Sequence, residues 1–265
     1  MVRRRTAASL PVFERINRPE LFFGMVGAIG TDLDAAGTVL RVALARVGYR
    51  VEIITLSALP QKYIAAFGDV VVSARTEERY RALMELGTEV RTALDRKEAL
   101  ARLAILDIRE KRGEARPGDD RGALLPIEGV AYVFKQLKRP EEIRFLRQVY
   151  GSAFQVIAVH ARRGKRREAL AAKIARSHFV SDAKQFYSTA EELIEIDERE
   201  LGRKYGQDVR DAFPLADFFI GSDDNATLTS STDRITRLLF GDQFVTPTRD
   251  EISMTFAQVA AYRFC

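Results

Sequence analysis

The stretch FFGMVGAIGTDLDAAGTVL, Phe22 to Leu40, decides the fold. It begins with an apolar run that ends in glycine, which is the pattern of a buried strand. After Asp32 the apolar side chains recur at helical spacing, and Thr31 with Asp34 makes a Ser/Thr-x-x-Asp/Glu helix start. The sequence therefore predicts a strand, a glycine-rich turn and a helix in direct succession.

The turn between this strand and this helix has the shape of a phosphate-binding loop but lacks its charges. Such a loop needs G-x-x-x-x-G-K-[S/T], in which backbone N–H groups and the lysine hold phosphate and the hydroxyl binds Mg²⁺. Counting from Gly27 places Asp32 at the second glycine, Leu33 at the lysine and Asp34 at the hydroxyl. The helix N-terminus still attracts an anion weakly, although the two acids oppose it, and a purely structural turn fits the same residues. We expect no phosphoryl transfer by the usual lysine mechanism.

Two segments supply the candidate ligand-binding residues. They are Gly27, Ala28, Gly30, Thr31 and Asp32 in the turn, and Arg162 in the basic segment ARRGKRRE, residues 161–168. Arg163 and Lys165 extend the basic face, which a ligand or an effector would contact. A solvated basic surface accounts for the same run, because a charge run alone specifies no ligand.

The rest of the chain continues the pattern that this stretch begins. Gly48 ends the first helix, and YRVEIITL (49–56) reads as the second strand. Three further strands are predicted at 129–137, 153–160 and 215–222. Helices are predicted over 76–112 with a bend at Gly87, after Pro140, and over 164–177 and 232–241. Strands alternating with helices indicate an α/β fold, a doubly wound and mostly parallel five-stranded sheet flanked by helices.

We expect three parts along the chain. Residues 1–20 form a polar arm, residues 21–243 the α/β domain, and residues 244–265 a linker and a C-terminal helix over 248–264. Thr248 and Glu251 make a capping box at the start of that helix, and its apolar stripe requires a partner. The helix either docks back on the α/β domain or opens a second domain.

Composition limits the possible functions. The 265 residues carry a net charge of +5, which favours contact with polyanions such as nucleotides and nucleic acid. A single cysteine, Cys265, excludes an internal disulfide and is typical of a reducing cytoplasm. No apolar run is long enough to span a membrane, so we expect a cytoplasmic protein without membrane contact. His160 and His178 lie on different predicted elements, which argues against a metal site. The acids at 197, 198, 208, 211 and 217 are expected at the surface or as loop caps.

Four segments together resemble a known family. They are GAIGTDLDAAG (27–37), LKRPEEIRFLRQVYG (137–151), YGQDVRDAFPLADFFI (205–220) and PTRDEISMTFAQVAA (247–261). In this order they resemble the anti-phage dCTP/dCMP deaminases of bacteria, from about Glu20 to the end of the chain. That family joins a P-loop-kinase-like domain to a zinc-dependent deaminase domain, which depletes the deoxycytidine nucleotides that a phage needs. The resemblance implies a nucleotide or phage-derived effector as ligand, possible control by an inhibitory small RNA, and a homo-oligomer in the parent protein.

The resemblance also implies what this chain does not do by itself. A zinc deaminase needs H-x-E and P-C-x-x-C motifs, and neither occurs in the sequence. Zinc therefore belongs to the missing deaminase domain, and the chain alone is expected to be inactive as a deaminase. The family tends to have an acid in the pattern Phe-Asp-Ser-Leu-Lys where this chain has FKQLK (134–138). Lys135 thus reverses the charge at a place suited to Mg²⁺ or to a signalling contact. Ile196 replaces an arginine that the family tends to carry.

Three functional hypotheses remain open from the sequence. The leading one is a regulatory, nucleotide-kinase-like domain of an antiviral deaminase, without catalytic residues of its own. The alternative is a nucleoside monophosphate kinase-like phosphotransferase or nucleotide-binding protein, in which Arg91, Arg162 or Arg210 replaces the missing lysine. The third is an RNA-binding module that uses residues 161–168.

Overall fold

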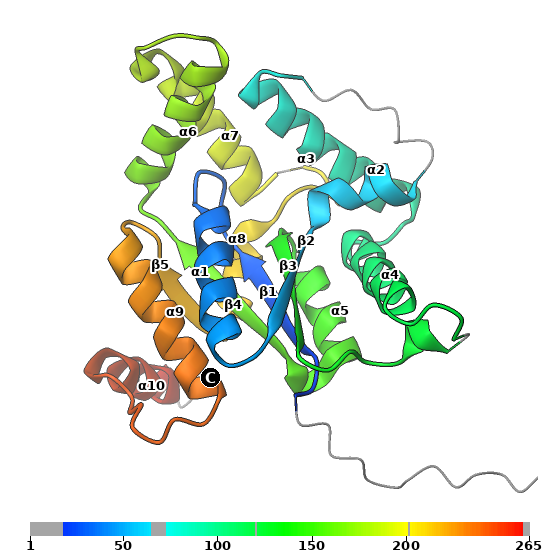
Figure 1. The fold of residues 1–265 in the computed structure, drawn as a ribbon. Coiled ribbons are helices and arrows are strands. Elements are labelled where there is room, and N and C mark those ends of the chain that lie inside the picture. The colour runs from blue at the N-terminus through cyan, green and yellow to red at the C-terminus, as the bar shows by residue number, and fades with distance from the viewer. Residues whose placement is uncertain (1–17, 65–72, 120, 201, 262–265) are drawn as a thin grey trace, which may run out of the picture.

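A five-stranded sheet forms the centre of the molecule (Figure 1). The computed structural model describes residues 18–64, 73–119, 121–200 and 202–261. The strands are β1 (Leu21–Val26), β2 (Arg50–Thr55), β3 (Val130–Leu137), β4 (Phe154–His160) and β5 (Phe218–Gly221). Their order is β2-β3-β1-β4-β5, and all four neighbouring pairs are parallel. The predicted α/β class with five parallel strands is confirmed.

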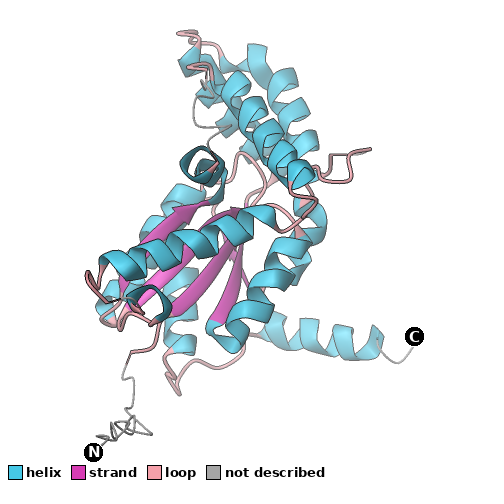
Figure 2. Ribbon diagram, turned by 90° about the vertical axis from the view of Figure 1, so that its right-hand side faces the viewer, coloured by secondary structure: helices cyan, strands magenta, loops and turns pink. Residues whose placement is uncertain are grey.

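Helices cover both faces of this sheet, as Figures 1 and 2 show. One face packs against α1 (Leu33–Arg46) and α9 (Asn225–Leu239). The other face packs against α2 (Leu59–Tyr63), α3 (Thr76–Ala93), α4 (Ala99–Glu114), α5 (Pro140–Tyr150) and α8 (Val209–Ala212). Successive side chains of β1 point to opposite faces of the sheet. Phe23 is buried in the core beneath α1 and α9, and Phe22 is buried in the core on the other face.

A helical hairpin lies beyond the carboxyl ends of the strands. It consists of α6 (Arg163–Ser177) and α7 (Tyr187–Glu198), and it packs against α3. Its core contains Leu170, Ile174, Leu193 and Ile194, and Ile29 from the turn after β1 is buried in the same cluster. The hairpin therefore rests directly on the glycine turn.

Several predicted helix boundaries need correction. The segment 76–112 forms two helices, with the break between Ala93 and Ala99, and α3 continues through Gly87. A Cβ at Gly87 would lie 3.6 Å from Leu100 of α4, which is ordinary van der Waals contact, so the helix passes through this position without a bend. Helices α2, α7 and α8 were not predicted, and α9 begins earlier than 232.

The start of α1 also differs from the predicted Thr31–Asp34 pair. The N-cap is Asp32, whose side chain accepts a hydrogen bond from the Ala35 N–H at 2.9 Å. Aspartate is preferred over threonine at an N-cap. Because Asp32 occupies this position, the Thr31 hydroxyl has no hydrogen-bond partner among the described residues.

The C-terminal helix α10 (Arg249–Ala261) confirms its predicted capping box. The Thr248 N–H donates to Glu251 Oε2 at 2.6 Å, and the Glu251 N–H donates to Thr248 Oγ1 at 3.2 Å. In Figure 2 this helix projects from the body, and Met254 and Phe256 are exposed. The boundaries 1–20, 21–243 and 244–265 stay predictions. Residues 1–17 and Cys265 lie outside the described residues. Within the described residues, no helix is long and apolar enough to cross a membrane.

Candidate anion-binding site

The turn Gly27–Asp32 leaves the carboxyl end of β1 and enters α1 beneath the α6–α7 hairpin. Gly30 has φ +87°, a conformation that favours glycine. A Cβ at Gly30 would also lie 2.6 Å from the carbonyl oxygen of Arg166 on α6. Close packing against the hairpin is thus sufficient reason for this glycine.

Two backbone N–H groups of this turn, those of Ile29 and Thr31, and the N–H of Leu33 that follows it have acceptors inside the protein. The Thr31 N–H donates to Ala28 O at 3.1 Å, and the Leu33 N–H donates to Thr31 O at 3.1 Å. The Ile29 N–H donates to Asp197 Oδ2 at 2.7 Å. A carboxylate of the protein therefore accepts from this turn, as a bound anion would.

Asp197 corrects a prediction. We expected it at the surface or as a loop cap, but its side chain is only 1% exposed. Lys138, which follows β3, places its Nζ 2.7 Å from Asp197 Oδ1 and donates to Gly27 O at 3.1 Å. This lysine therefore ties the turn to α7 and to the end of β3, and its charge compensates the buried carboxylate.

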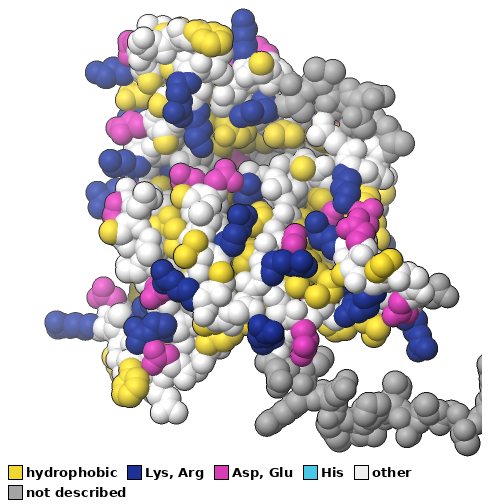
Figure 3. Space-filling model, viewed as in Figure 1, with side chains coloured by type: hydrophobic (Ala, Val, Ile, Leu, Met, Phe, Trp, Pro, Cys, Tyr) yellow, Lys and Arg dark blue, Asp and Glu magenta, His cyan; other side chains and the backbone are white. Residues whose placement is uncertain are grey.

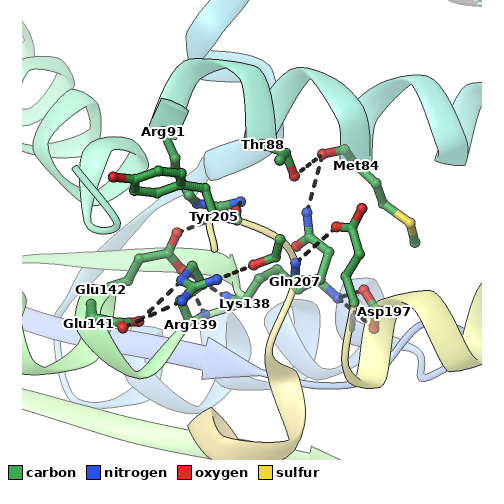
Figure 4. A network of polar contacts seen from close by, with 12 residues as sticks. Met84, Thr88, Arg91, Lys138, Arg139, Glu141, Glu142, Asp197, Tyr205 and Gln207 are labelled. Atoms are coloured by element: carbon green, nitrogen blue, oxygen red, sulfur yellow. Dashed lines mark hydrogen bonds and ion pairs between the residues drawn. The ribbon is translucent and has the colours of Figure 1, made fainter. Parts of the chain in front are cut away.

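A second buried ion pair lies next to Lys138 (Figure 4). Arg91 of α3 donates to Glu142 of α5 at 3.0 Å, and both side chains are buried. The other Glu142 oxygen accepts from the backbone N–H groups of Lys138 at 2.8 Å and of Arg139 at 3.2 Å. Arg91 also donates to Tyr205 O at 3.4 Å. These bonds fix the segment that carries Lys138.

Glu141 extends this network toward solvent. Its carboxylate pairs with Lys97 at 2.9 Å and with Arg139 at 3.1 Å. Burial alone would raise the pKa of this group, but the hydrogen bonds from Lys97 and Arg139 outweigh it and lower the pKa from 4.5 to about 2. Glu141 is therefore ionised at neutral pH.

A cavity of about 120 Å³ opens beside the turn. One wall is mainly apolar and comes from α3 and α4, with Tyr80, Leu83, Met84 and Leu100. The other walls carry four cationic side chains against two carboxylates. The cations are Lys135, Lys138, Lys173 and Arg91, and the carboxylates are Asp34 and Asp197.

Two buried polar groups at this cavity have no hydrogen-bond partner among the described residues. They are the Thr31 hydroxyl, whose residue is 9% exposed, and Nε of Arg91. Lys173 of α6 makes no ion pair with another described residue. Buried donors usually have an acceptor, so these groups are unsatisfied polar groups in residues that line the cavity.

Lys135 and Asp34 meet at the mouth of the same cavity. Lys135 lies near the end of β3, opposite Met25 of β1, and its Nζ is 2.6 Å from Asp34 Oδ1. Asp34 is 82% exposed and Lys135 only 16%. The lysine is therefore held in place, while the aspartate can turn away.

The structure brings together four of the six predicted ligand-binding residues. Gly27, Ala28, Gly30 and Thr31 line the cavity. The Asp32 side chain caps α1 instead. Arg162 is not among the lining residues; its exposed guanidinium lies 3.3 Å from Asp223.

The rest of the basic segment 161–168 is largely neutralised by α7. Arg163 pairs with Glu191 at 2.5 Å and with Glu198 at 2.8 Å, and Arg166 pairs with Glu198 at 2.7 Å. Lys165 is exposed. Figure 3 shows Lys and Arg side chains spread over the face in view, with acidic side chains among them.

Sequence reasoning missed Lys138, Lys173 and Asp197 as site residues. Lys138 follows a predicted strand, and the carboxyl ends of parallel strands are where ligands bind in such sheets, so its position carried a usable signal. Nothing local marked Lys173 or Asp197, because the hairpin that carries them is placed by packing on the turn.

Comparison with known proteins adds little to this picture. No family model matches the sequence, and no curated protein matches it either. One solved structure that is similar is a gluconokinase from Sinorhizobium meliloti 1021. It is 12% identical, covers 84% of this chain and 97% of its own, and has a TM-score of 0.35. The sheet order and the glycine turn after β1 define a parallel five-stranded α/β fold, and the comparison assigns no family.

Proposed function

We propose that this chain binds a phosphorylated ligand of the nucleoside monophosphate class in the cavity beside Gly27–Asp32. The observation that carries the proposal is the division of the cavity walls. Tyr80, Leu83 and Met84 offer an apolar surface for a flat base, and the lysines at 135, 138 and 173 offer positive charge for a phosphate. A pocket that is mostly apolar with a few convergent polar groups is typical of such sites.

The size of the cavity favours one phosphate over three. Its volume of about 120 Å³ is small. Pockets for drug-sized ligands usually measure roughly 300–1,000 Å³. A nucleoside monophosphate exceeds this volume by less than a triphosphate does.

Binding without phosphoryl transfer is the activity that these residues support. Leu33 has no charge to place on a transferring phosphate, and Asp34 brings negative charge to the position of the usual hydroxyl. The Ile29 N–H of the turn donates to Asp197, so this donor is not free to hold a phosphate. We therefore assign a sensing or regulatory role.

The resemblance to anti-phage deoxycytidine nucleotide deaminases would give this role a setting. In that setting the chain is the regulatory domain, and its ligand is a nucleotide or a phage-derived effector. The four ordered sequence segments support this narrower proposal. Sequencing the genomic DNA after the codon for Cys265 tests it, since in-frame or frameshifted H-x-E and P-C-x-x-C motifs there would support the proposal.

The second candidate is phosphoryl transfer by a kinase-like enzyme, which the fold class favours. It requires another cation to replace the missing lysine. Arg91 lines the cavity but is committed to Glu142, and Arg162 faces Asp223. Lys173, which lines the cavity and makes no ion pair with another described residue, is better placed. Formation of ADP from ATP that depends on an added nucleoside monophosphate would establish this activity in place of the sensing role.

Calorimetry with the four deoxynucleoside monophosphates tests ligand binding. The variant Lys173→Ala removes one cavity lysine and should weaken binding about tenfold or more, as expected for a charge-assisted hydrogen bond. Lys165→Ala is the matched control, because Lys165 lies on the same helix α6 but outside the cavity. Equal affinities of the two variants, or no saturable binding by the unaltered chain, would contradict the proposal.

A further inference from the structure

A kinase-like fold implies a magnesium ion beside the bound phosphate. In P-loop proteins the ion is held by the hydroxyl that follows the loop lysine and by an aspartate. The hydroxyl position here is Asp34, the second residue of α1. The side chain that meets it from the neighbouring strand β3 is Lys135, at 2.6 Å.

These residues do not fit a magnesium ion. The ammonium of Lys135 lies where a divalent cation would contact Asp34, and two like charges repel strongly at such short range. Lys138 and Lys173 add further positive charge to the same cavity. Elsewhere among the described residues, no group of three His, Cys, Asp or Glu side chains is placed to hold a metal.

The same lysine fits a phosphate. Its Nζ has three donors, its stem is fixed at the end of β3, and its present partner Asp34 is largely exposed. An exposed ion pair contributes little free energy, so a phosphate oxygen can replace the aspartate at small cost. Lys135 thereby supplies the positive charge that a metal ion supplies in related folds.

We infer that the ligand phosphate binds as the metal-free anion, with the Lys135 ammonium in the place of Mg²⁺. This inference rests on the proposed nucleotide-binding function. Mg²⁺ in solution then competes with the protein for the phosphate instead of bridging the two.

Calorimetry in excess EDTA and in excess Mg²⁺, at equal ionic strength, tests the inference with dAMP, dCMP, dGMP and dTMP as probes. Affinity in EDTA is expected to equal or exceed affinity in Mg²⁺. The variant Lys135→Asp should lose about tenfold or more in EDTA. It should regain affinity in Mg²⁺, because it places two carboxylates at the site. Lys165→Asp, with the same change of charge outside the cavity, should behave as the unaltered chain.

The outcomes separate this inference from the function on which it rests. Saturable binding in Mg²⁺ but not in EDTA would overturn metal-free binding and leave the nucleotide site intact. Absence of binding in both buffers would overturn the nucleotide site and the inference with it. Direct titration with Mn²⁺ gives a readout without nucleotide: no saturable binding is expected for the unaltered chain, and binding is expected for Lys135→Asp. Saturable Mn²⁺ binding by the unaltered chain that Asp34→Asn abolishes would place a metal beside Asp34 and overturn the inference.

Discussion

Two groups of basic residues differ in how the fold uses them. The α6 basic face, which comprises Arg162, Arg163, Lys165, Arg166 and Arg167, is dense in sequence and conspicuous in composition. The cavity lysines, which comprise Lys135, Lys138 and Lys173, are separated along the chain and meet only in the folded protein.

The difference lies in what faces each group. Glutamates of α7 pair with the α6 basic face, and the Arg167 guanidinium stacks over the Tyr187 ring at 4.7 Å. Among the cavity lysines, Lys138 pairs with buried Asp197 and Lys135 pairs with Asp34, which is largely exposed. Lys173 makes no ion pair with another described residue, and Lys135 can exchange an exposed partner for a ligand at small cost, so the sparse group is the better candidate site.

The largest expected effect is on the free energy of unfolding, and it distinguishes a buried ion pair from a partly exposed one. Glu142→Gln leaves the Arg91 guanidinium buried without its counter-charge and should cost about 3–5 kcal/mol of unfolding free energy. Glu198→Gln, which removes a partly exposed partner of the α6 basic face, should cost less than Glu142→Gln. Urea unfolding of both variants measures the difference. Similar small losses would show that the network beside the cavity does not hold the structure together.

The next largest expected effect is on phosphate affinity. It concerns Asp197, whose carboxylate accepts a hydrogen bond from the Ile29 N–H. Asp197→Asn removes a negative charge from Lys138 and from the Ile29 N–H, so affinity for inorganic phosphate should rise about tenfold. Thermal stability should fall at the same time, because Lys138 loses its buried partner.

Glu198→Gln again serves as the control for this variant. It lies next to Asp197 on α7 but faces α6, and it should leave phosphate affinity unchanged. A gain of the same size in both variants would mean that overall charge, rather than the position of Asp197, governs binding.

Much of the fold could be predicted because local signals and tertiary packing agree. The apolar runs before Gly27 and after Gly48 became β1 and β2, and Gly48 adopts φ +84° after α1 as a helix-ending glycine does. The predicted capping box at Thr248 and Glu251 is present, with both of its hydrogen bonds. These features depend on neighbours in sequence, which the sequence displays directly.

The site could be predicted only in part, because its charges are assembled from distant segments. The missing loop lysine and the reversed charge at Lys135 were visible. The buried position of Asp197 was not, since an acid in LIEIDERE (193–200) looks like one more surface charge. Its burial depends on Lys138 and on the Ile29 N–H, which lie far away in the chain.

A smaller effect on the free energy of unfolding should appear as the pH is lowered. Glu141 has a pKa of about 2 in the folded protein and 4.5 ordinarily, so its ionised form stabilises the fold above pH 4.5. This contribution is lost as the pH falls through 4.5 toward 2. Urea midpoints of Glu141→Gln and the unaltered chain should therefore differ at pH 6 and converge near pH 2.

Glu192 on α7 gives the matched comparison. Its hydrogen bond with Arg81 lowers its pKa, but its side chain is 58% exposed and solvent screens the pair. Glu192→Gln should therefore shift the midpoint less than Glu141→Gln at every pH. The reverse order would mean that exposed pairs along the hairpin stabilise the fold more than the network beside the cavity.

The smallest expected effect concerns RNA on the α6 basic face. Because Glu191 and Glu198 already pair with Arg163 and Arg166, single-stranded RNA should bind weakly, and its affinity should fall as salt rises. The double variant Glu191→Gln, Glu198→Gln uncovers these arginines and should strengthen binding modestly and steepen the salt dependence. Fluorescence anisotropy at two salt concentrations measures both quantities. Tight RNA binding by the unaltered chain that weakens in Arg162→Ala, Lys165→Ala would reverse the comparison, since the dense basic segment would then be the functional one.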